Sequence, residues 1–234
     1  MRCLILGAGY VGSRLLARRT DAVGTTRDGR AGTLRFSLDD ETTWHVVPRG
    51  LPTVWTFAAT DAARALRFRD QRLGDAPLIV LGSTSAYRTA APDAWVDEGT
   101  PLDLSQPRVQ TEEALRVKGA TVLQLAGIWG PERDPIQWLL GGRIRNGDKY
   151  VNLAHVDDIL ATIDALSGTP RPGVRINVCD GEPRRWREHV AALQELGTIP
   201  PGFVLPSTID ADSKRVRNDL LRSVLPGHPF VRLT

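Results

Sequence analysis

The sequence predicts an α/β protein built on a doubly wound parallel sheet, with a small C-terminal α/β lobe. Three observations predict this class. Short apolar stretches alternate with amphipathic stretches through the first half of the chain, which is typical of successive β–α units. One apolar stretch, residues 76–82, is almost continuously hydrophobic, as expected for a strand buried on both faces of a parallel sheet. A glycine-rich turn joins the first apolar stretch to the first amphipathic one.

The predicted elements follow this alternation as far as residue 130. We expect strands at residues 2–6, 21–26, 33–38, 52–59, 76–82 and 121–125. We expect helices at residues 13–19, 40–46, 61–73 and 106–117, the third of them capped by Thr60.

Beyond residue 130 the alternation loosens. We expect helices near 136–144, 156–166, 184–196 and 214–225, and strands near Tyr150 and at 174–179. We therefore divide the chain into a dinucleotide-binding core, residues 1–130, and a small substrate lobe, residues 131–234. Segments around residues 150–180 are expected to return to the core and complete its sheet.

The first loop carries the spacing G-x-G-x-x-G at Gly7, Gly9 and Gly12. In a dinucleotide-binding Rossmann unit the first glycine makes the tight turn, the second lets the backbone approach the pyrophosphate, and the third lets helix and strand pack closely. The free N–H groups where this turn opens the helix would then bind the anion, with Tyr10 and Val11 of the turn beside it. The alternative is a glycine turn that merely joins a strand to a helix.

The end of the second strand predicts which dinucleotide binds. An NAD-selective site usually has an acid there that bonds the ribose 2′-hydroxyl. This chain has Thr25 and Thr26, followed by Arg27 and then Arg30. A guanidinium beside hydroxyls suits a 2′-phosphate, so we expect NADP. Alternatively, Arg27 is a solvated loop residue and the neighbouring Asp28 bonds a ribose.

Other loops at the carboxyl ends of strands should complete the site. Leu38, Ala58 and Ala59, at the ends of the third and fourth predicted strands, are expected to lie against the cofactor. The fifth strand runs into Ser83-Thr84-Ser85-Ala86-Tyr87, a polar cluster after a very apolar stretch. Ser83, in this cluster, is expected to lie beside the cofactor, unless these hydroxyls only cap the backbone of a turn.

Composition narrows the classes of partner. The net charge is only +3, from 30 basic and 27 acidic residues, and the arginines are scattered, which argues against nucleic-acid binding. Cys3 and Cys179 lie in strand-like stretches without neighbouring ligands, so we expect buried thiols rather than a metal site or a disulfide. A core strand beginning at residue 2 and the absence of a long apolar run predict a cytoplasmic protein with no membrane contact. We expect a small-molecule substrate, and a homodimer is possible.

Together the motifs resemble the NAD-dependent epimerase/dehydratase family, the extended branch of the short-chain dehydrogenase/reductase superfamily, in the style of its short, atypical members. The resemblance covers nearly the whole chain, and the order of the segments is more specific than any one of them. The segments are Gly7–Gly12, Ser83–Tyr87, Asp97–Pro101, Leu125–Pro131, Asn152–Asp158, Asn177–Asp180 and Lys214–Asn218.

The resemblance implies a dinucleotide-binding core, a substrate lobe that closes over the nicotinamide, and roles for particular residues. Ser83 would be the catalytic hydroxyl that hydrogen-bonds the reacting oxygen. His155 falls in the His-Val-x-Asp segment of the family, where either a chemical or a structural role is open. The structural alternative is that Asp157 and Asp158 favour the start of a helix.

The family's acid/base pair, Tyr-x-x-x-Lys on the helix after the fifth strand, is missing. The three tyrosines are Tyr10, Tyr87 and Tyr150, and none lies in the required window. In one register Leu104 and Arg108 occupy the two positions, and no register places a tyrosine and a lysine there. The first asparagine of the chain is Asn146, so the family's helper asparagine is missing as well.

Three functions remain open. The first is an NADP(H)-dependent oxidoreductase for a small carbonyl or imine, with Tyr87, Tyr150, His155 or water as proton donor. In such an enzyme Arg108 would hold an anionic substrate or polarise its oxygen, unless it is only a solvated helix residue. The second is a dinucleotide-binding sensor or scaffold without chemistry. The third, a nucleotide-sugar epimerase or dehydratase, is disfavoured by the missing tyrosine.

Overall fold

A computed structural model describes residues 2–208 and 212–234. The chain forms two compact units that are interleaved in sequence. A single boundary at residue 130 does not separate the two units. Residues 87–101 and 125–130, before it, belong to the second unit, and residues 160–176, after it, belong to the first. The first unit comprises Met1–Ala86, Leu102–Gln124 and Leu160–Ile176, and the second comprises Tyr87–Pro101, Leu125–Ile159 and Asn177–Thr234.

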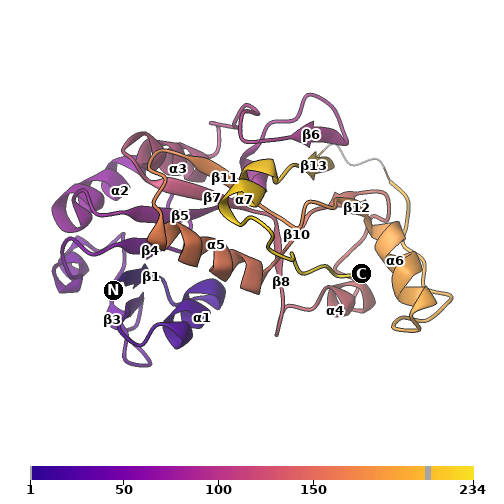
Figure 1. Ribbon diagram of the computed structural model, residues 1–234, viewed down its shortest axis with the longest axis horizontal. Helices are drawn as coiled ribbons and strands as arrows, with labels where there is room; N and C mark the ends of the chain where they lie inside the picture. Colours follow the sequence, from indigo (N-terminus) through magenta and orange to yellow (C-terminus); the bar gives the residue numbers. More distant parts are fainter. Residues whose placement is uncertain (1, 209–211) are drawn as a thin grey trace. The chain divides into compact units, whose positions relative to one another are not determined.

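A seven-stranded sheet in the order β11-β7-β5-β4-β1-β2-β3 forms the centre of the first unit (Figure 1). The pairs β4–β5, β1–β4, β1–β2 and β2–β3 are parallel, as the sequence predicted. Its strands are β1 (Leu4–Leu6), β2 (Val23–Thr26), β3 (Leu34–Arg35), β4 (Thr53–Trp55) and β5 (Leu78–Ser83), together with β7 (Thr121–Leu125) and β11 (Arg175–Val178), which run on into the second unit.

Helices cover both faces of this sheet, which makes it doubly wound. In Figure 1, α2 and α3 lie on one face and α1 and α5 on the other, and α2 packs against α3. The helical segments are α1 (Tyr10–Arg18), α2 (Ala62–Phe68), α3 (Pro107–Val117), α5 (Val156–Gly168, which begins in the second unit), the 3₁₀ segments η1 (Glu41–Val46) and η3 (Thr84–Ala86), and the π segment η2 (Arg69–Leu73).

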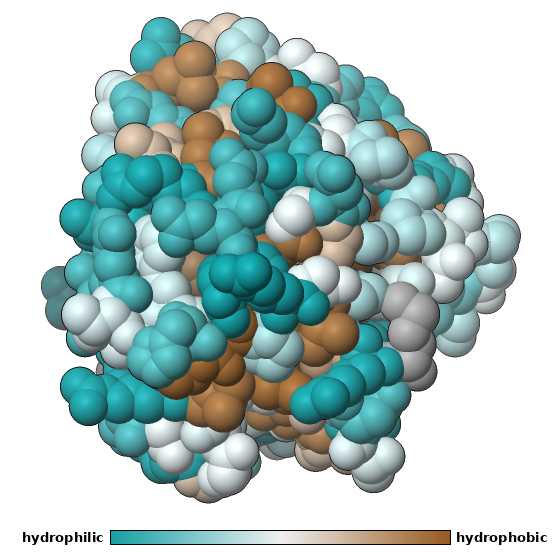
Figure 2. Space-filling model, turned by 90° about the vertical axis from the view of Figure 1, so that its left-hand side faces the viewer, coloured by the Kyte–Doolittle hydropathy of each residue, from teal (hydrophilic) through white to brown (hydrophobic). Residues whose placement is uncertain are grey.

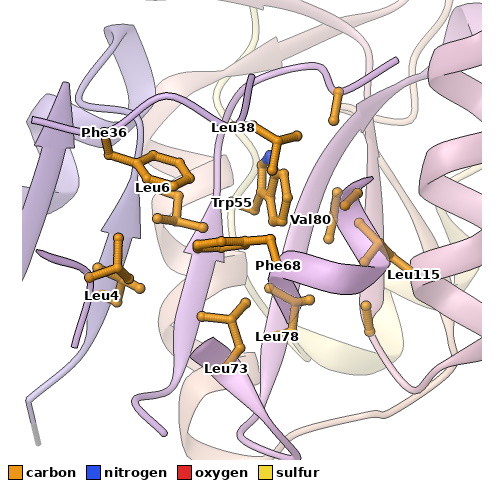
Figure 3. Packing of buried hydrophobic residues seen from close by; sticks show 14 of the residues in the cluster. Leu4, Leu6, Phe36, Leu38, Trp55, Phe68, Leu73, Leu78, Val80 and Leu115 are labelled. Atoms are coloured by element: carbon orange, nitrogen blue, oxygen red, sulfur yellow. The ribbon is translucent and has the colours of Figure 1, made fainter. Parts of the chain in front are cut away.

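The core of the first unit lies between the sheet and α2 (Figure 3). Phe68, the last residue of α2, is fully buried, and its ring contacts Phe36 and Trp55 at centroid distances of 4.9 and 5.8 Å. Leu4 and Leu6 of β1 are also fully buried, as expected for a strand with no polar position. Burying an aromatic side chain of this size stabilises the fold by about 2–3 kcal/mol. The packed core thereby fixes the strands whose carboxyl ends carry the loops described below.

The second unit consists of short strand pairs and helices around a separate apolar core, which includes Leu139, Trp186 and Leu193. The pairs β8–β10 and β6–β13 are parallel, and β9–β12 is antiparallel. Its elements are β6 (Ala94–Val96), β8 (Gly127–Trp129), α4 (Pro135–Leu140), β9 (Tyr150–Val151), β10 (Leu153–His155), β12 (Arg184–Arg185), α6 (Trp186–Glu195), β13 (Lys214–Val216) and α7 (Asp219–Val224).

Several predicted helices differ from the structure. Residues 184–185 of the helix predicted at 184–196 form β12, and the helix predicted at 61–73 is capped by Asp61, whose side chain accepts the Arg64 N–H, rather than by Thr60. The helix predicted at 214–225 is wrong over its first turn, because residues 214–216 form β13 and pair with β6. Asn218 then precedes the short helix α7. The helix predicted at 61–73 changes to π geometry after Phe68 and ends at Gly74, whose φ of +61° stops it.

Among the described residues no helix combines the length and the apolar character that crossing a membrane requires. The face shown in Figure 2 carries mostly hydrophilic residues, with hydrophobic ones exposed in patches between them.

Candidate dinucleotide site

A hollow of about 440 Å³ lies in the first unit at the carboxyl ends of β1, β2 and β4. This is the edge of a parallel sheet at which ligands bind. The glycine loop, the loops after β2 and β3 and the loop after β4 all contribute to it. Its lining residues are Gly7, Ala8, Gly9, Thr25, Thr26, Arg27, Asp28, Arg30, Phe36, Ser37, Leu38, Asp39, Phe57, Ala58, Ala59, Thr60 and Asp61.

The glycine turn is held in place by β2. Gly7 N–H donates to Thr25 Oγ1 at 3.0 Å, and Ala8 N–H donates to the Thr25 carbonyl at 2.8 Å. Gly7 has a φ of +94°, which favours glycine. A Cβ on Gly12 would lie 2.1 Å from the Gly7 carbonyl oxygen, so the third glycine is required for α1 to pack against the turn. These contacts give Gly7 and Gly12 the two structural roles that the spacing predicted.

Gly9 differs from both neighbours because nothing lies within 4 Å of the position that its Cβ would take. Packing of the chain therefore does not explain this glycine, whereas close approach of a ligand would. Gly9 is also the N-cap of α1, no side chain caps the helix, and its first turn contains no acid. Uncapped N–H groups and the helix dipole favour an anion at this point. The turn thus fits a pyrophosphate.

The rim of the hollow carries both charges that select between dinucleotides. Arg27 is exposed, and no hydrogen bond or ion pair of its side chain is found among the described residues. Asp28 lies 3.7 Å from Arg30 Nε, and a hydrogen bond from Thr26 is the main cause that lowers the pKa of Asp28. Thr26 Oγ1 also lies 2.7 Å from Thr33 Oγ1. Thr26, Asp28 and Arg30 are therefore engaged with one another or with Thr33, and Arg27 is available.

The structure brings most of the predicted cofactor residues together. Of the thirteen, Tyr10, Val11, Gly12 and Ser83 do not line the hollow, and the other nine do. Val11 and Gly12 are buried at the start of α1, and Arg14 stacks 3.9 Å from the centre of the Tyr10 ring. Thr25 is 1% exposed, so it supports the turn rather than presenting its hydroxyl to solvent.

Sequence reasoning did not predict several residues that line the hollow. Their signal was the same as for Leu38 and Ala58, namely a position just beyond the end of a strand. These residues are Ala8, Phe36, Ser37, Asp39, Phe57, Thr60 and Asp61.

A polar cluster follows β5 in the same unit. Ser83, at the end of β5, accepts a hydrogen bond from the Ser85 hydroxyl at 3.1 Å, and Ser85 Oγ accepts one from Arg108 Nη2 at 3.1 Å. Arg108 lies on α3, where it forms an ion pair with Glu112 one turn later. The Arg108 side chain is only 18% exposed, so it is not a solvated helix residue. Ser83 and Arg108, predicted separately, thus belong to one cluster, which we call the Ser–Arg cluster: Ser83, Ser85, Arg108, Glu112 and Gln124.

Tyr87 belongs to the second unit and is 4% exposed. Its hydroxyl donates to Asn177 Oδ1, and the Asn177 N–H donates to Glu98 Oε1 at 2.9 Å. Burial raises the pKa of Glu98, an effect that this N–H opposes. The structure therefore gives the Tyr87 hydroxyl a buried partner, which does not support the predicted role of proton donor.

His155, also in the second unit, ends β10 and is 9% exposed. Its ring packs edge-on against Trp129, with centroids 4.7 Å apart. The Nδ1 atom accepts the backbone N–H of Asp157, at 3.2 Å, in the first turn of α5. These contacts correspond to the structural alternative for the His-Val-x-Asp segment, that of fixing the start of α5. Asp158 has a similar role, because it accepts hydrogen bonds from His228 at 2.7 Å and from Val231 N–H at 3.1 Å.

Comparison with known proteins gives relatives in sequence and in structure. No family model matches the chain. Protein YeeZ of Escherichia coli K12 is 30% identical over 157 residues, which span 61% of this chain and 56% of YeeZ, so the chain spans little more than half of that relative. A functionally unknown conserved protein from Silicibacter pomeroyi is 27% identical, with a TM-score of 0.65, over 99% of this chain and 93% of its own.

A third relative carries a cofactor. It is a short-chain dehydrogenase/reductase superfamily protein from Agrobacterium tumefaciens with bound NAD, 17% identical, with a TM-score of 0.74 over 96% of this chain and 91% of its own. The chain has the short-chain dehydrogenase/reductase fold. The fold predicted from the resemblance in sequence is thereby confirmed.

By the resemblance in sequence, the acid/base pair expected to be missing would stand on the helix after the fifth strand of the sheet. That helix is α3, and residues 107–117 contain neither tyrosine nor lysine. Arg108 and Glu112 stand on it with the same spacing of four residues and form an ion pair. The chain thus has a charged pair on this helix, but one without a phenol.

A second cavity, of about 390 Å³, lies in the first unit where strands begin rather than end. Cys3, Thr53 and Thr121 are among its lining residues, and each lies at or beside the start of a strand. Open parallel sheets bind their ligands at the opposite ends of the strands. In the described part of the chain no group of three or more His, Cys, Asp or Glu residues is suited to hold a metal ion.

Proposed function

We propose that the chain is an NADP(H)-dependent reductase of the extended short-chain dehydrogenase/reductase type that acts on a small carbonyl or imine compound. One observation carries the proposal. A glycine turn with open space at Gly9 and a cluster of hydroxyls at Ser83 follow strands of one sheet, at the same edge. The first can bind a dinucleotide and the second can bind a reacting oxygen.

The residues around the hollow fit a nicotinamide dinucleotide. The uncapped start of α1 would bind its pyrophosphate, and the small side chains of Ala58 and Ala59 leave room beside it. Arg27, exposed on the rim, would bind a 2′-phosphate, since a guanidinium forms charge-assisted bonds with phosphate oxygens. We therefore assign NADP rather than NAD. When bound, the reduced dinucleotide supplies hydride.

The residues of the chain would bind and orient the substrate. Ser83 would donate a hydrogen bond to the oxygen or nitrogen that becomes more negative during reduction. Because Tyr87 and His155 have partners of their own in the second unit, we assign the proton to a water molecule. Tyr150 is not chosen because its ring lies against Arg185 and Arg215, at 4.4 and 5.4 Å from the ring centre.

Calorimetry with the full chain tests the cofactor, and a substrate screen tests the chemistry. We expect NADPH to bind more tightly than NADH, and a panel of neutral ketones, aldehydes and cyclic imines to include compounds that consume NADPH. Tight NADPH binding without turnover of any compound would favour a dinucleotide sensor. Absence of binding to either dinucleotide would overturn the proposal.

A further inference from the structure

The Ser–Arg cluster is a continuous chain of hydrogen bonds that begins at a buried carboxylate and ends at Ser83. Glu112, on α3, is 4% exposed. One of its oxygens accepts Arg108 Nη1, and the other accepts Gln124 Nε2 at 3.1 Å. Arg108 Nη2 reaches Ser85, and Ser85 reaches Ser83. All five residues belong to the first unit.

The direction of these hydrogen bonds is determined by chemistry. Arginine has only donors, so Ser85 Oγ must accept from Arg108. The Ser85 hydroxyl proton is then free to point to Ser83 Oγ, which also accepts the Ser85 backbone N–H at 3.3 Å. Two acceptor positions of Ser83 are therefore used. Its own proton remains for an acceptor outside the cluster, since none is found for it in the described part of the chain.

Burial keeps Arg108 in this position. Burial raises the pKa of Glu112, whereas the charge of Arg108 lowers it and favours the ion pair. A Cβ on Gly82 would lie 2.6 Å from both Glu112 Oε2 and Gln124 Oε1, so these side chains pass directly over the backbone of β5. Removing one partner of a buried ion pair leaves the other uncompensated. Glu112 and Gly82 thus hold the guanidinium beside the serines.

We propose that Arg108 acts through Ser85 to make Ser83 a polarised hydrogen-bond donor for the carbonyl oxygen of a substrate. Hydrogen bonds in a chain strengthen one another, and here the chain begins at a fixed positive charge. Arg108 and Ser85 are then positioning residues, and Ser83 is the group that contacts substrate. This assignment rests on the proposed function.

The donor stabilises an oxyanion and does not itself give up its proton. A bound reduced dinucleotide would supply hydride to the carbonyl carbon, and the C=O π electrons would then move to the oxygen that Ser83 hydrogen-bonds. That oxygen then takes a proton from water, and hydroxide leaves. The balance is carbonyl compound, reduced dinucleotide and water going to alcohol, oxidised dinucleotide and hydroxide.

The cluster also narrows the substrate class. The charge of Arg108 is already paired with Glu112, so the cluster lacks a free cation for a carboxylate. The cluster ends at the Ser83 hydroxyl, which donates a hydrogen bond. A carbonyl oxygen can accept this hydrogen bond, whereas the nitrogen of a protonated imine cannot. The substrate is therefore a neutral aldehyde or ketone rather than an iminium ion.

A thiol placed at the end of the cluster tests the polarisation without cofactor or substrate. In Ser83→Cys, mass spectrometry of the peptide that contains position 83 measures how fast iodoacetamide alkylates the new thiol at each pH. The pH at which this rate is half of its maximum reports the pKa of the thiol. An unperturbed thiol has a pKa of about 8.5. We expect a midpoint about one unit lower, because the donors of Ser85 and the charge of Arg108 stabilise the thiolate. Cys3 and Cys179 are buried and are scored on separate peptides.

Two further substitutions in the Ser83→Cys background identify the cause. Arg108→Gln and Ser85→Ala should each raise the midpoint by about one unit, a tenfold loss of thiolate at neutral pH. Arg116→Gln is the matched control, because Arg116 is also paired with a glutamate on α3, Glu113, but does not contact the serines. If circular dichroism shows that Arg108→Gln does not fold, Arg108→Lys replaces it. This variant keeps the charge but loses the two-nitrogen guanidinium geometry, so the midpoint should rise by less than in Arg108→Gln.

The outcomes separate the two proposals. An equal midpoint in Ser83→Cys with and without the Arg108 substitution overturns this inference, even if the chain reduces carbonyl compounds. A midpoint that follows Arg108 but not Ser85 also overturns it, because the charge would then act directly. A shifted midpoint in a chain that binds no dinucleotide leaves the polarised donor in place and overturns the proposed function.

Discussion

Thr25, on β2, accepts the N–H of Gly7 from the turn that follows β1, so one buried hydroxyl fixes the geometry of the glycine loop. Thr25→Val removes this acceptor and leaves a buried donor unpaired, which costs about 1–3 kcal/mol of unfolding free energy. Thr25→Ser keeps the oxygen and should lose less. Urea unfolding compares the two variants, and equal losses would mean that the hydroxyl does not hold the turn.

Arg27 should determine the preference for NADPH over NADH. Arg27→Ala removes a charge-assisted contact worth about 1.5–3 kcal/mol, so the preference should fall by roughly ten- to hundred-fold. Calorimetry with both dinucleotides measures this. Arg49→Ala, at an exposed arginine of the same unit that does not line the hollow, is the control. Equal affinities for NADPH and NADH in the unaltered chain would contradict the prediction, and would point to Asp28 as a ribose ligand.

Gly9 and Gly12 should respond in opposite ways to added side chains. Gly9→Val meets open space and an extended backbone, φ −80° and ψ −156°, so the fold should persist while NADPH binding is lost. Gly12→Ala forces a Cβ against the Gly7 carbonyl and should lower the unfolding free energy by about 1–3 kcal/mol or more. Calorimetry and thermal melting distinguish the two effects. Normal NADPH binding by Gly9→Val would make the loop only a turn.

Tyr87→Phe should affect stability and leave the pH dependence of turnover unchanged. The substitution removes a hydroxyl that is buried against Asn177, and an unpaired buried amide oxygen costs about 1–3 kcal/mol. Thermal melting measures the loss, and the pH profile of NADPH oxidation supplies the second measurement. If Tyr87→Phe has normal stability but a shifted pH profile of NADPH oxidation, Tyr87 would again be the candidate proton donor.

His189 should make the protein less stable in mild acid. It is buried in the second unit, its Nδ1 lies 3.1 Å from Thr234 Oγ1, and burial lowers its pKa from 6.5 to about 4. Between these values the unfolded chain binds the proton more strongly, so the unfolding free energy falls as the pH falls from 6.5 to 4. The full effect is about 2–4 kcal/mol. Urea titrations of the unaltered chain and of His189→Phe over this range should diverge, and parallel curves would contradict the prediction.

Asp180 acts in the opposite direction over part of the same range. Burial raises its pKa from 3.8 to about 6, so its folded form binds the proton more strongly, and stability is gained as the pH falls from 6 to 3.8. Asp180→Asn is therefore the complementary variant. Without the gain from Asp180, its unfolding free energy, measured by urea titration, should fall more steeply with decreasing pH than that of the unaltered chain.

The long apolar stretches predicted the main sheet because they are buried whatever their partners are. β7 was predicted with its observed limits, and β1, β4 and β5 lie within or close to the predicted ranges. The glycine loop could be predicted because its function depends on local backbone geometry. In the second unit only β9 was predicted, as the strand near Tyr150. Strands β6 and β13 could not be predicted, because they pair with each other across about 120 residues of the chain and each has only three residues. Each of these strands is stabilised by the strand with which it pairs, and the sequence within the strand does not indicate that pairing.

The same distinction applies to the candidate site. Ser83 ends β5 and Arg27 directly follows β2, so the positions of both could be predicted from the sequence. The partner of Tyr87 is 90 residues away, and nothing near Tyr87 indicates that its hydroxyl is buried. Arg108 is an intermediate case, because the spacing of Arg108 and Glu112 permits an ion pair, whereas the contact with Ser85 depends on how α3 packs beside β5.

The interleaving of the two units has a consequence for synthesis on the ribosome. The chain alternates between them in six segments, and the last segment of the first unit ends at Ile176. The edge strand β11, which begins at Arg175, is therefore translated after every other strand of the sheet. Until then β7 has an unpaired edge, and such edges invite pairing with other chains. A nascent chain stalled before Arg175 would consequently be the form most in need of a chaperone.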